Sequence, residues 1–386
     1  MVVATLVVAE AAVLLMRPRD RLEPVDVAAR AYFSPAQIER AADFRGGQRA
    51  LYGVRLAITL GVLIVVVRRP PRWLGRRPVL AGAATAAALA VTLTVATLPV
   101  GIVVRERAKD VGLVTQDWVG YAGDVVKSTT IEAALWAAGG ALLIVGMRRF
   151  GRGWWAPAAA LIVAFGVVFT YAGPILLDPV FNRFTALPAG TLRSSVLELG
   201  DRAGVEIGEV YEMDASRRTT AANAYVAGLG ATKRVVLYDT LLDDFSPAEV
   251  RGVVAHELGH VRFHDVPRGL LYLAIVAPLG MLAAARLAER FGRTPAATVP
   301  AVVLALSLMA PAITTISNQL SRAVEARADR YAMELTDDPE ALIGFQRRIA
   351  VQNVAEPDPP GWATFLLGTH PTTMQRIGQA LAFERR

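Results

Sequence analysis

Long apolar runs alternate with polar stretches along most of this chain. The apolar runs dominate the first 180 residues and return after residue 268. A run of about 18 or more apolar residues can cross the roughly 30 Å hydrocarbon core of a bilayer as a helix. We therefore predict a polytopic membrane protein with seven spans, near residues 1–16, 50–67, 79–104, 130–147, 154–177, 269–288 and 297–318.

The first apolar run, near residues 1–16, is short and carries Glu10. It lacks the basic lead and the cleavage site that are typical of a signal peptide. The run is therefore either a membrane span or a helix that lies at the membrane interface, and we predict a span.

Two stretches have the polarity of water-soluble protein, residues 178–267 and 319–386. Because two predicted spans separate them, both stretches lie on the same face of the membrane and can build one site. We expect a mainly α-helical membrane protein with a small α+β domain. Its parts are residues 1–177 with five N-terminal spans, 178–267 with the first soluble part, 268–318 with spans six and seven, and 319–386 with the second soluble part.

The first soluble stretch predicts both strands and helices. Residues 191–203 have the pattern of an amphipathic helix, and "GEVYEMD", "NAYVAG" and "RVVLYD" have that of short strands. In "SPAEV", Ser246 is placed to cap a helix, Pro247 to open it, and Glu249 to complete a capping box. We predict a helix from about 247 to 264 that ends before Pro267.

Composition excludes some chemistries. The chain has no cysteine, so disulfides, thiolate metal sites and cysteine nucleophiles are excluded. The net charge of +7 comes mainly from arginines that flank apolar runs, which favours contact with anionic lipid headgroups over nucleic acid. Seven arginines in loop 17–49 oppose five in loop 68–77, so the positive-inside rule assigns no orientation.

The sequence "HELGH" has the pattern of a metal-binding helix. His256 and His260 are four residues apart and share a helix face, so both can bind one ion. Two imidazoles for Zn²⁺ with Glu257 between them as a general base form the HExxH pattern of metallopeptidases. The alternative is a helix whose histidines and glutamate only face solvent.

A third histidine follows, but we do not expect it to bind the metal. On a continuous helix, His264 lies about 12 Å along the axis from His256. No glycine or proline between 260 and 264 interrupts the helix, and a Zn–N bond is only about 2.0–2.1 Å long. We expect His264 to be a cation at the helix end or a hydrogen-bond partner within the site.

A further ligand must then come from the second soluble stretch. In "SRAVEARADRYAMEL", Glu325 and Asp329 are four residues apart on one helix face, with small alanines that permit close helix contact. Glu325 can be the third ligand and Asp329 the hydrogen-bond partner of a ligand histidine. The alternative is an ordinary surface helix of alternating charge, which the neighbouring arginines favour: Arg322, Arg327 and Arg330.

"HELGH" followed by "EARAD" resembles the type I CAAX prenyl protease family, integral-membrane zinc metallopeptidases related to the HtpX-type proteases. Four other segments are also similar to segments of that family and occur in the same order along the chain: "YFSPAQIERAADF", "DPVFNRFTALPAG", "NAYVAG" and "THPTTMQRI". The resemblance implies seven helices around a water-filled chamber, which the zinc domain closes at its cytosolic end.

The resemblance also implies roles for individual residues. The implied zinc ligands, one ion per chain, are His256, His260 and Glu325, with Glu257 as base and Asp329 as a supporting carboxylate. It further implies that His370 faces the scissile carbonyl, that Arg376 lies lower in the site, and that the cleft is lined by Asn223, Ala224 and Tyr225. Read from the sequence alone, Asn223 could be a turn residue and His370 structural.

We therefore expect a zinc metalloendopeptidase that hydrolyses membrane-associated or lipidated peptides. The expected location is a bacterial cytoplasmic membrane, in contact with its lipids, with the catalytic domain on the cytoplasmic face. One alternative is quality-control cleavage of damaged membrane proteins, as by HtpX-type proteases. Another is a silent chamber that binds lipopeptides, which the complete set of base and ligands disfavours. Neither substrate nor oligomeric state follows from the sequence.

Overall fold

The computed structural model describes residues 1–70, 77–292 and 297–386. Most of loop 68–77, with two of its five arginines, lies outside the described residues. Among those described, six helices are long and apolar enough to cross a membrane, which confirms the predicted polytopic architecture. They are α2 (Pro35–Arg68), α3 (Pro78–Asp110), α4 (Trp118–Phe150), α5 (Trp155–Leu176), α10 (Asp265–Phe291) and α11 (Thr298–Thr336).

The first predicted span is a shorter helix, α1 (Val2–Met16). Fifteen residues at 1.5 Å each extend about 22 Å, which is less than the hydrocarbon core. The helix packs against α10 and α11, where Ala9 and Val13 are buried with Tyr272 and Leu320. It is therefore part of the helical assembly.

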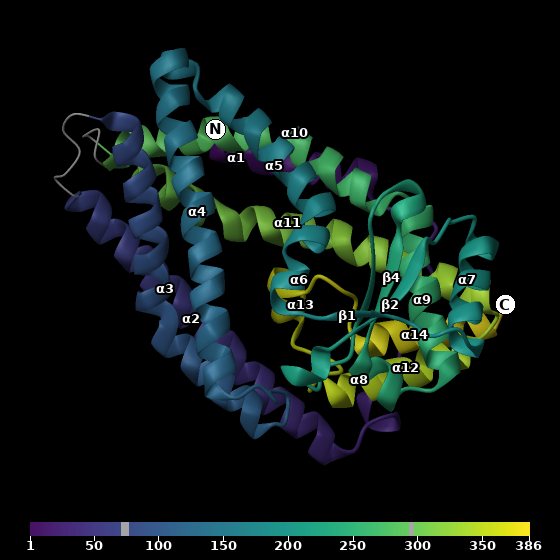
Figure 1. Ribbon diagram of the computed structural model, residues 1–386. Coiled ribbons are helices and arrows are strands. Elements are labelled where there is room, and N and C mark those ends of the chain that lie inside the picture. Colours follow the sequence, from purple (N-terminus) through teal and green to yellow (C-terminus); the bar gives the residue numbers. More distant parts are fainter. Residues whose placement is uncertain (71–76, 293–296) are drawn as a thin grey trace.

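A small α+β domain lies at one end of the molecule, and α2, α3 and α4 lie at the other, with α11 crossing between them (Figure 1). The four-stranded sheet of the α+β domain has the order β1 (Phe184–Ala186), β2 (Glu209–Met213), β4 (Arg234–Tyr238) and β3 (Ala224–Ala227). β2 and β4 are parallel, and the other two pairs are antiparallel. The predicted strands are confirmed, and β3 forms an edge of the sheet.

Helices cover the sheet and complete the domain. Besides α9 (Pro247–Arg262), they are α6 (Asp178–Phe181), α7 (Thr191–Ala203), α8 (Asp239–Asp244), α12 (Pro339–Gln352), α13 (Gly361–Leu367) and α14 (Thr373–Glu384). Val196 of α7, Leu237 of β4 and Val254 and Leu258 of α9 are fully buried together. Burying each such side chain stabilises the fold by about 1.5–3 kcal/mol, so this core fixes α9 against the sheet.

The metal-binding helix ends earlier than predicted. α9 stops at Arg262, and His264 adopts the left-handed conformation with φ 55°, after which α10 begins at Asp265. Pro267 does not end α9 but lies in the first turn of α10, where its missing N–H removes no helix bond. The prediction of a continuous helix to residue 264 is therefore wrong, because His264 adopts a left-handed conformation that ends the helix without a glycine or proline.

Candidate metal centre

Helix α9 places His256 and His260 side by side. Its start is fixed by the predicted capping box, in which Ser246 accepts from the Glu249 N–H and Glu249 accepts from the Ser246 N–H. Two turns later the imidazoles face each other, with their Nε2 atoms 3.2 Å apart. The arrangement follows from the four-residue spacing on a single helix face.

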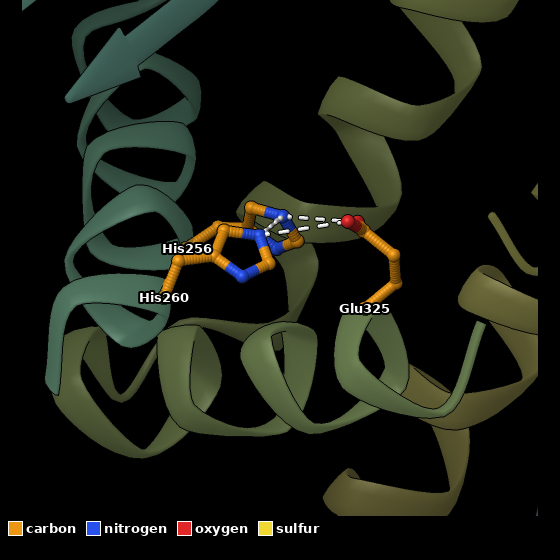
Figure 2. Close-up of side chains that lie close together, drawn as sticks. All are labelled: His256, His260 and Glu325. Atoms are coloured by element: carbon orange, nitrogen blue, oxygen red, sulfur yellow. Dashed lines mark hydrogen bonds and ion pairs between the residues drawn. The ribbon is translucent and has the colours of Figure 1, made fainter. Parts of the chain in front are cut away.

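Glu325 comes from α11, which crosses close to α9. Gly259 makes the close approach possible, because a Cβ at this position would lie 3.1 Å from the ring of Tyr331. The Glu325 carboxylate oxygens lie 3.3 Å from Nε2 of His256 and 3.6 Å from Nε2 of His260. The three side chains point toward one another, and a ligand atom from each lies within 4.8 Å of the others (Figure 2).

This cluster fits a metal ion. Nδ1 of His256 donates to Asp329 at 2.8 Å, and Nδ1 of His260 donates to Asp265 at 3.0 Å. In the neutral form that binds a metal, each imidazole therefore turns an Nε2 lone pair inward, toward the other Nε2 and toward the Glu325 carboxylate. Oε2 of Glu325 is buried and has no hydrogen-bond partner among the described residues. A cation held between the three groups satisfies all of these acceptors.

Asp329 connects the cluster to α14. It is fully buried, and Arg376 donates to it through Nε at 2.7 Å and Nη2 at 2.5 Å. Arg376, Asp329 and His256 thus form one chain of charge-assisted hydrogen bonds, which fixes the imidazole tautomer.

An equivalent arrangement supports His260, and the sequence did not indicate it. Asp265 accepts from His260 and forms an ion pair with Arg327, whose guanidinium lies 4.2 Å from the ring centre of Phe263. Arg327 is 5% exposed, so the reading of this segment as an ordinary surface helix is wrong. The turn at His264 carries Asp265 back toward His260, whereas the His264 side chain is not part of the cluster.

Glu257 lies between the two histidines on α9 and is partly buried. Burial raises the pKa of its carboxyl above the usual range, although the nearby histidines act in the opposite direction. A carboxylate with a raised pKa accepts a proton more readily at neutral pH, as a general base requires.

His370 approaches the cluster from the loop before α14. Its Nε2 lies 3.4 Å from Oε2 of Glu325, and its Nδ1 lies 2.8 Å from Oγ1 of Thr369. Arg322 of α11 holds this loop by donating to the Gly368 carbonyl at 2.6 Å. His370 and Arg376 border a cavity of about 920 Å³ whose other walls include residues of α2, α11 and α12.

The residues expected to line the cleft belong to the edge of the sheet. Asn223 is exposed and directly precedes β3, while Ala224 and Tyr225 lie within β3, which packs beside α9. The Tyr225 hydroxyl donates to Asp178 at 2.7 Å. The structure therefore places a sheet edge next to the metal-binding helix.

Comparison with known proteins gives consistent results. Residues 186–384 match Peptidase family M48. The chain is 32% identical over 303 residues to the uncharacterized metalloprotease YhfN of Bacillus subtilis (strain 168), covering 76% of this chain and 71% of that protein. It is 29% identical over 227 residues to the CAAX prenyl protease 1 homolog of Oryza sativa subsp. japonica, covering 55% and 52%.

A solved structure shares the whole architecture. The crystal structure of S. mikatae Ste24p superposes with a TM-score of 0.79 at 19% identity, covering 98% of this chain and 97% of that one. At this identity the likeness shows the fold. Together with the family match and the apolar helices, it leads to one assignment: the chain belongs to peptidase family M48 and is an integral-membrane metallopeptidase.

Proposed function

We propose that the metal is Zn²⁺, bound by His256, His260 and Glu325, and that the protein is a zinc metalloendopeptidase. The convergence of these three side chains carries the proposal, together with a buried Glu325 oxygen that has no hydrogen-bond partner among the described residues. Two histidines and one glutamate are a known ligand set of catalytic zinc, which leaves a position open for water or substrate.

The surrounding residues divide the work of peptide-bond hydrolysis. Zinc, when bound, supplies a Lewis acid that polarises the scissile carbonyl and acidifies water. Glu257 accepts the proton of the attacking water and delivers it to the leaving amine. His370 stabilises the negative charge that develops on the carbonyl oxygen. Asp329, held by Arg376, keeps the His256 imidazole oriented.

The substrate binds as an extended peptide along the free edge of β3, at Asn223, Ala224 and Tyr225. An edge strand offers unpaired backbone groups, and peptides that add to such an edge are bound mainly through main-chain hydrogen bonds. The position of β3 beside α9 supports this mode, because it brings the peptide next to the metal cluster.

The substrates we propose are membrane-associated or lipidated peptides. Apolar side chains, including Leu56, Leu366 and Leu367, form part of the walls of the cavity next to His370, and one relative is named as a CAAX prenyl protease homolog. HtpX-like cleavage of damaged membrane proteins is the second candidate. We place the protein in a bacterial cytoplasmic membrane among its lipids, with the domain on the cytoplasmic face.

The Glu257→Gln variant tests this proposal. It should keep its metal, measured by elemental analysis of the purified protein, and lose cleavage of an unfolded membrane substrate in detergent. Peptides that accumulate in cells with this variant, compared with wild type, identify the substrate class. A variant that cleaves as well as wild type would exclude the mechanism, and a wild type that binds metal without cleaving would indicate a binding chamber.

A further inference from the structure

The free edge of β3 has a defined set of outward-facing groups. The Tyr238 N–H donates to the Asn223 carbonyl at 3.1 Å, in the register that pairs β3 antiparallel with β4. Because hydrogen-bonded and non-hydrogen-bonded pairs alternate along such a ladder, Tyr225 also faces β4. The N–H and C=O groups of Ala224 and Val226 therefore point away from β4, along the outer edge of the sheet.

The next outward-facing residue, Ala222, is already paired. Oδ1 of Asn353 accepts from the Ala222 N–H at 3.1 Å, and Nδ2 of Asn353 donates to the Ala222 carbonyl at 3.4 Å. A side-chain amide thus occupies both backbone groups, as an adjacent strand would. Beside it, Gln352 donates to the Thr220 carbonyl at 2.7 Å without contacting Ala222.

Asn353 is held firmly in this position. It caps the end of α12, and Arg45 of α2 donates to the carbonyls of Asn353 at 2.7 Å and Val354 at 2.8 Å. Val354 is buried and has φ 46°, a left-handed conformation that β-branched residues rarely adopt and that persists only where the surroundings enforce it. The Asn353 amide is therefore a built element at the border of the cavity that also contains His370.

We propose that Asn353 is a positioning residue that closes the Ala222 end of the binding edge. The inference rests on the proposed strand addition of the substrate. A peptide that adds to β3 pairs with Ala224 and Val226 and must leave the edge before Ala222. Asn353 thereby limits how many residues on one side of the scissile bond contribute main-chain hydrogen bonds, and so shapes which peptides are cleaved.

A backbone N-methylation scan tests the proposal. The probe is a peptide that the full-length protein cleaves at one mapped bond, prepared as a series with a single N-methyl group at each position. In wild type, methylation lowers kcat/KM where the peptide N–H pairs with Ala224 or Val226, and has no effect at the position opposite Ala222. In Asn353→Ala, that position becomes sensitive, with a loss of about two- to tenfold for one hydrogen bond.

Gln352→Ala is the matched control, because it removes a neighbouring bond of α12 and leaves the Asn353 amide in place. It should keep the wild-type scan. Asn353→Ser, whose side chain is too short to pair with both groups of Ala222, is the second variant if Asn353→Ala does not fold. Metal content and thermal unfolding report on folding.

The outcomes are distinct. A scan unchanged in both Asn353 variants overturns the closing role of Asn353, as does a wild type that is sensitive opposite Ala222. A wild type that cleaves but is insensitive at every position overturns strand addition itself. If wild type cleaves no better than Glu257→Gln, the proposed peptidase function itself fails. This outcome differs from loss of the Asn353 role and from loss of strand addition, because both of those require a wild type that cleaves.

Discussion

Replacing Asp265 with asparagine should weaken zinc binding without removing a ligand. The carboxylate accepts from Nδ1 of His260 at 3.0 Å and pairs with Arg327, and both side chains of this pair are almost fully buried, 7% and 6% exposed. Asparagine keeps the shape of the side chain but replaces a charged acceptor by a neutral one. The His260 imidazole then loses both basicity and orientation.

Substituting such a partner typically lowers metal affinity 10–100-fold, which corresponds to about 1.4–2.7 kcal/mol. Because little solvent reaches the Asp265 carboxylate, we expect the upper half of this range. The substitution also leaves the Arg327 guanidinium buried without its anion, and breaking a buried ion pair costs about 3–5 kcal/mol of folding stability. Zinc affinity and stability must therefore be measured separately.

The assay is competition for Zn²⁺ against a chromophoric chelator, on protein shown to be folded by thermal unfolding. Asp124→Asn is the matched control. Asp124 forms an ion pair with Arg218 at 2.8 Å, and neither residue belongs to the metal cluster. The control should lose some stability and keep its zinc affinity. If Asp265→Asn bound zinc as tightly as wild type, the supporting role of this carboxylate would be refuted.

Four further substitutions and one pH measurement test the site. His264→Ala should leave the zinc content, measured by elemental analysis, unchanged, whereas Glu325→Ala should abolish zinc binding. The reverse result would overturn the ligand assignment. Gly259→Val should separate α11 from α9 and lower zinc content and thermal stability together, because even a Cβ here lies 3.1 Å from an aromatic ring. Gly252→Ala on the same helix, where a Cβ meets nothing within 4 Å, is its control and should retain zinc. Burial raises the pKa of Glu257, so in the metal-free protein its carboxyl should take up a proton as pH falls through a value above the ordinary pKa of about 4.3, followed by NMR of the carboxyl carbon; protonation at or below that value would contradict this.

Local signals in the sequence predicted α9 and the strands well. The capping box formed by Ser246 and Glu249 depends only on neighbouring residues, and so does the helix face shared by His256 and His260. The strands follow from short β-branched and aromatic runs, as in "RVVLY". These elements are determined within a few residues, so no knowledge of the tertiary structure is needed to predict them.

The turn after the metal-binding helix could not be predicted in the same way. The absence of glycine and proline between 260 and 264 suggested a continuous helix, but His264 adopts the left-handed conformation. Tertiary contacts stabilise this turn, since Asp265 binds both His260 and Arg327 from α11. The same contacts explain why Arg327 resembled a surface charge, because its partner lies 62 residues away in the sequence.

The membrane helices are part of the metal site and not only its anchor. Glu325 lies 65 residues beyond His260, and the chain between them forms α10 and most of α11. The position of Glu325 relative to α9 therefore depends on how this pair of apolar helices packs. The contact of Gly259 with α11 and the pair between Asp265 and Arg327 then fix the crossing point of α9 and α11. A soluble fragment without α10 and α11 would lack the third ligand, so the fold of the membrane part is a condition for assembling the site.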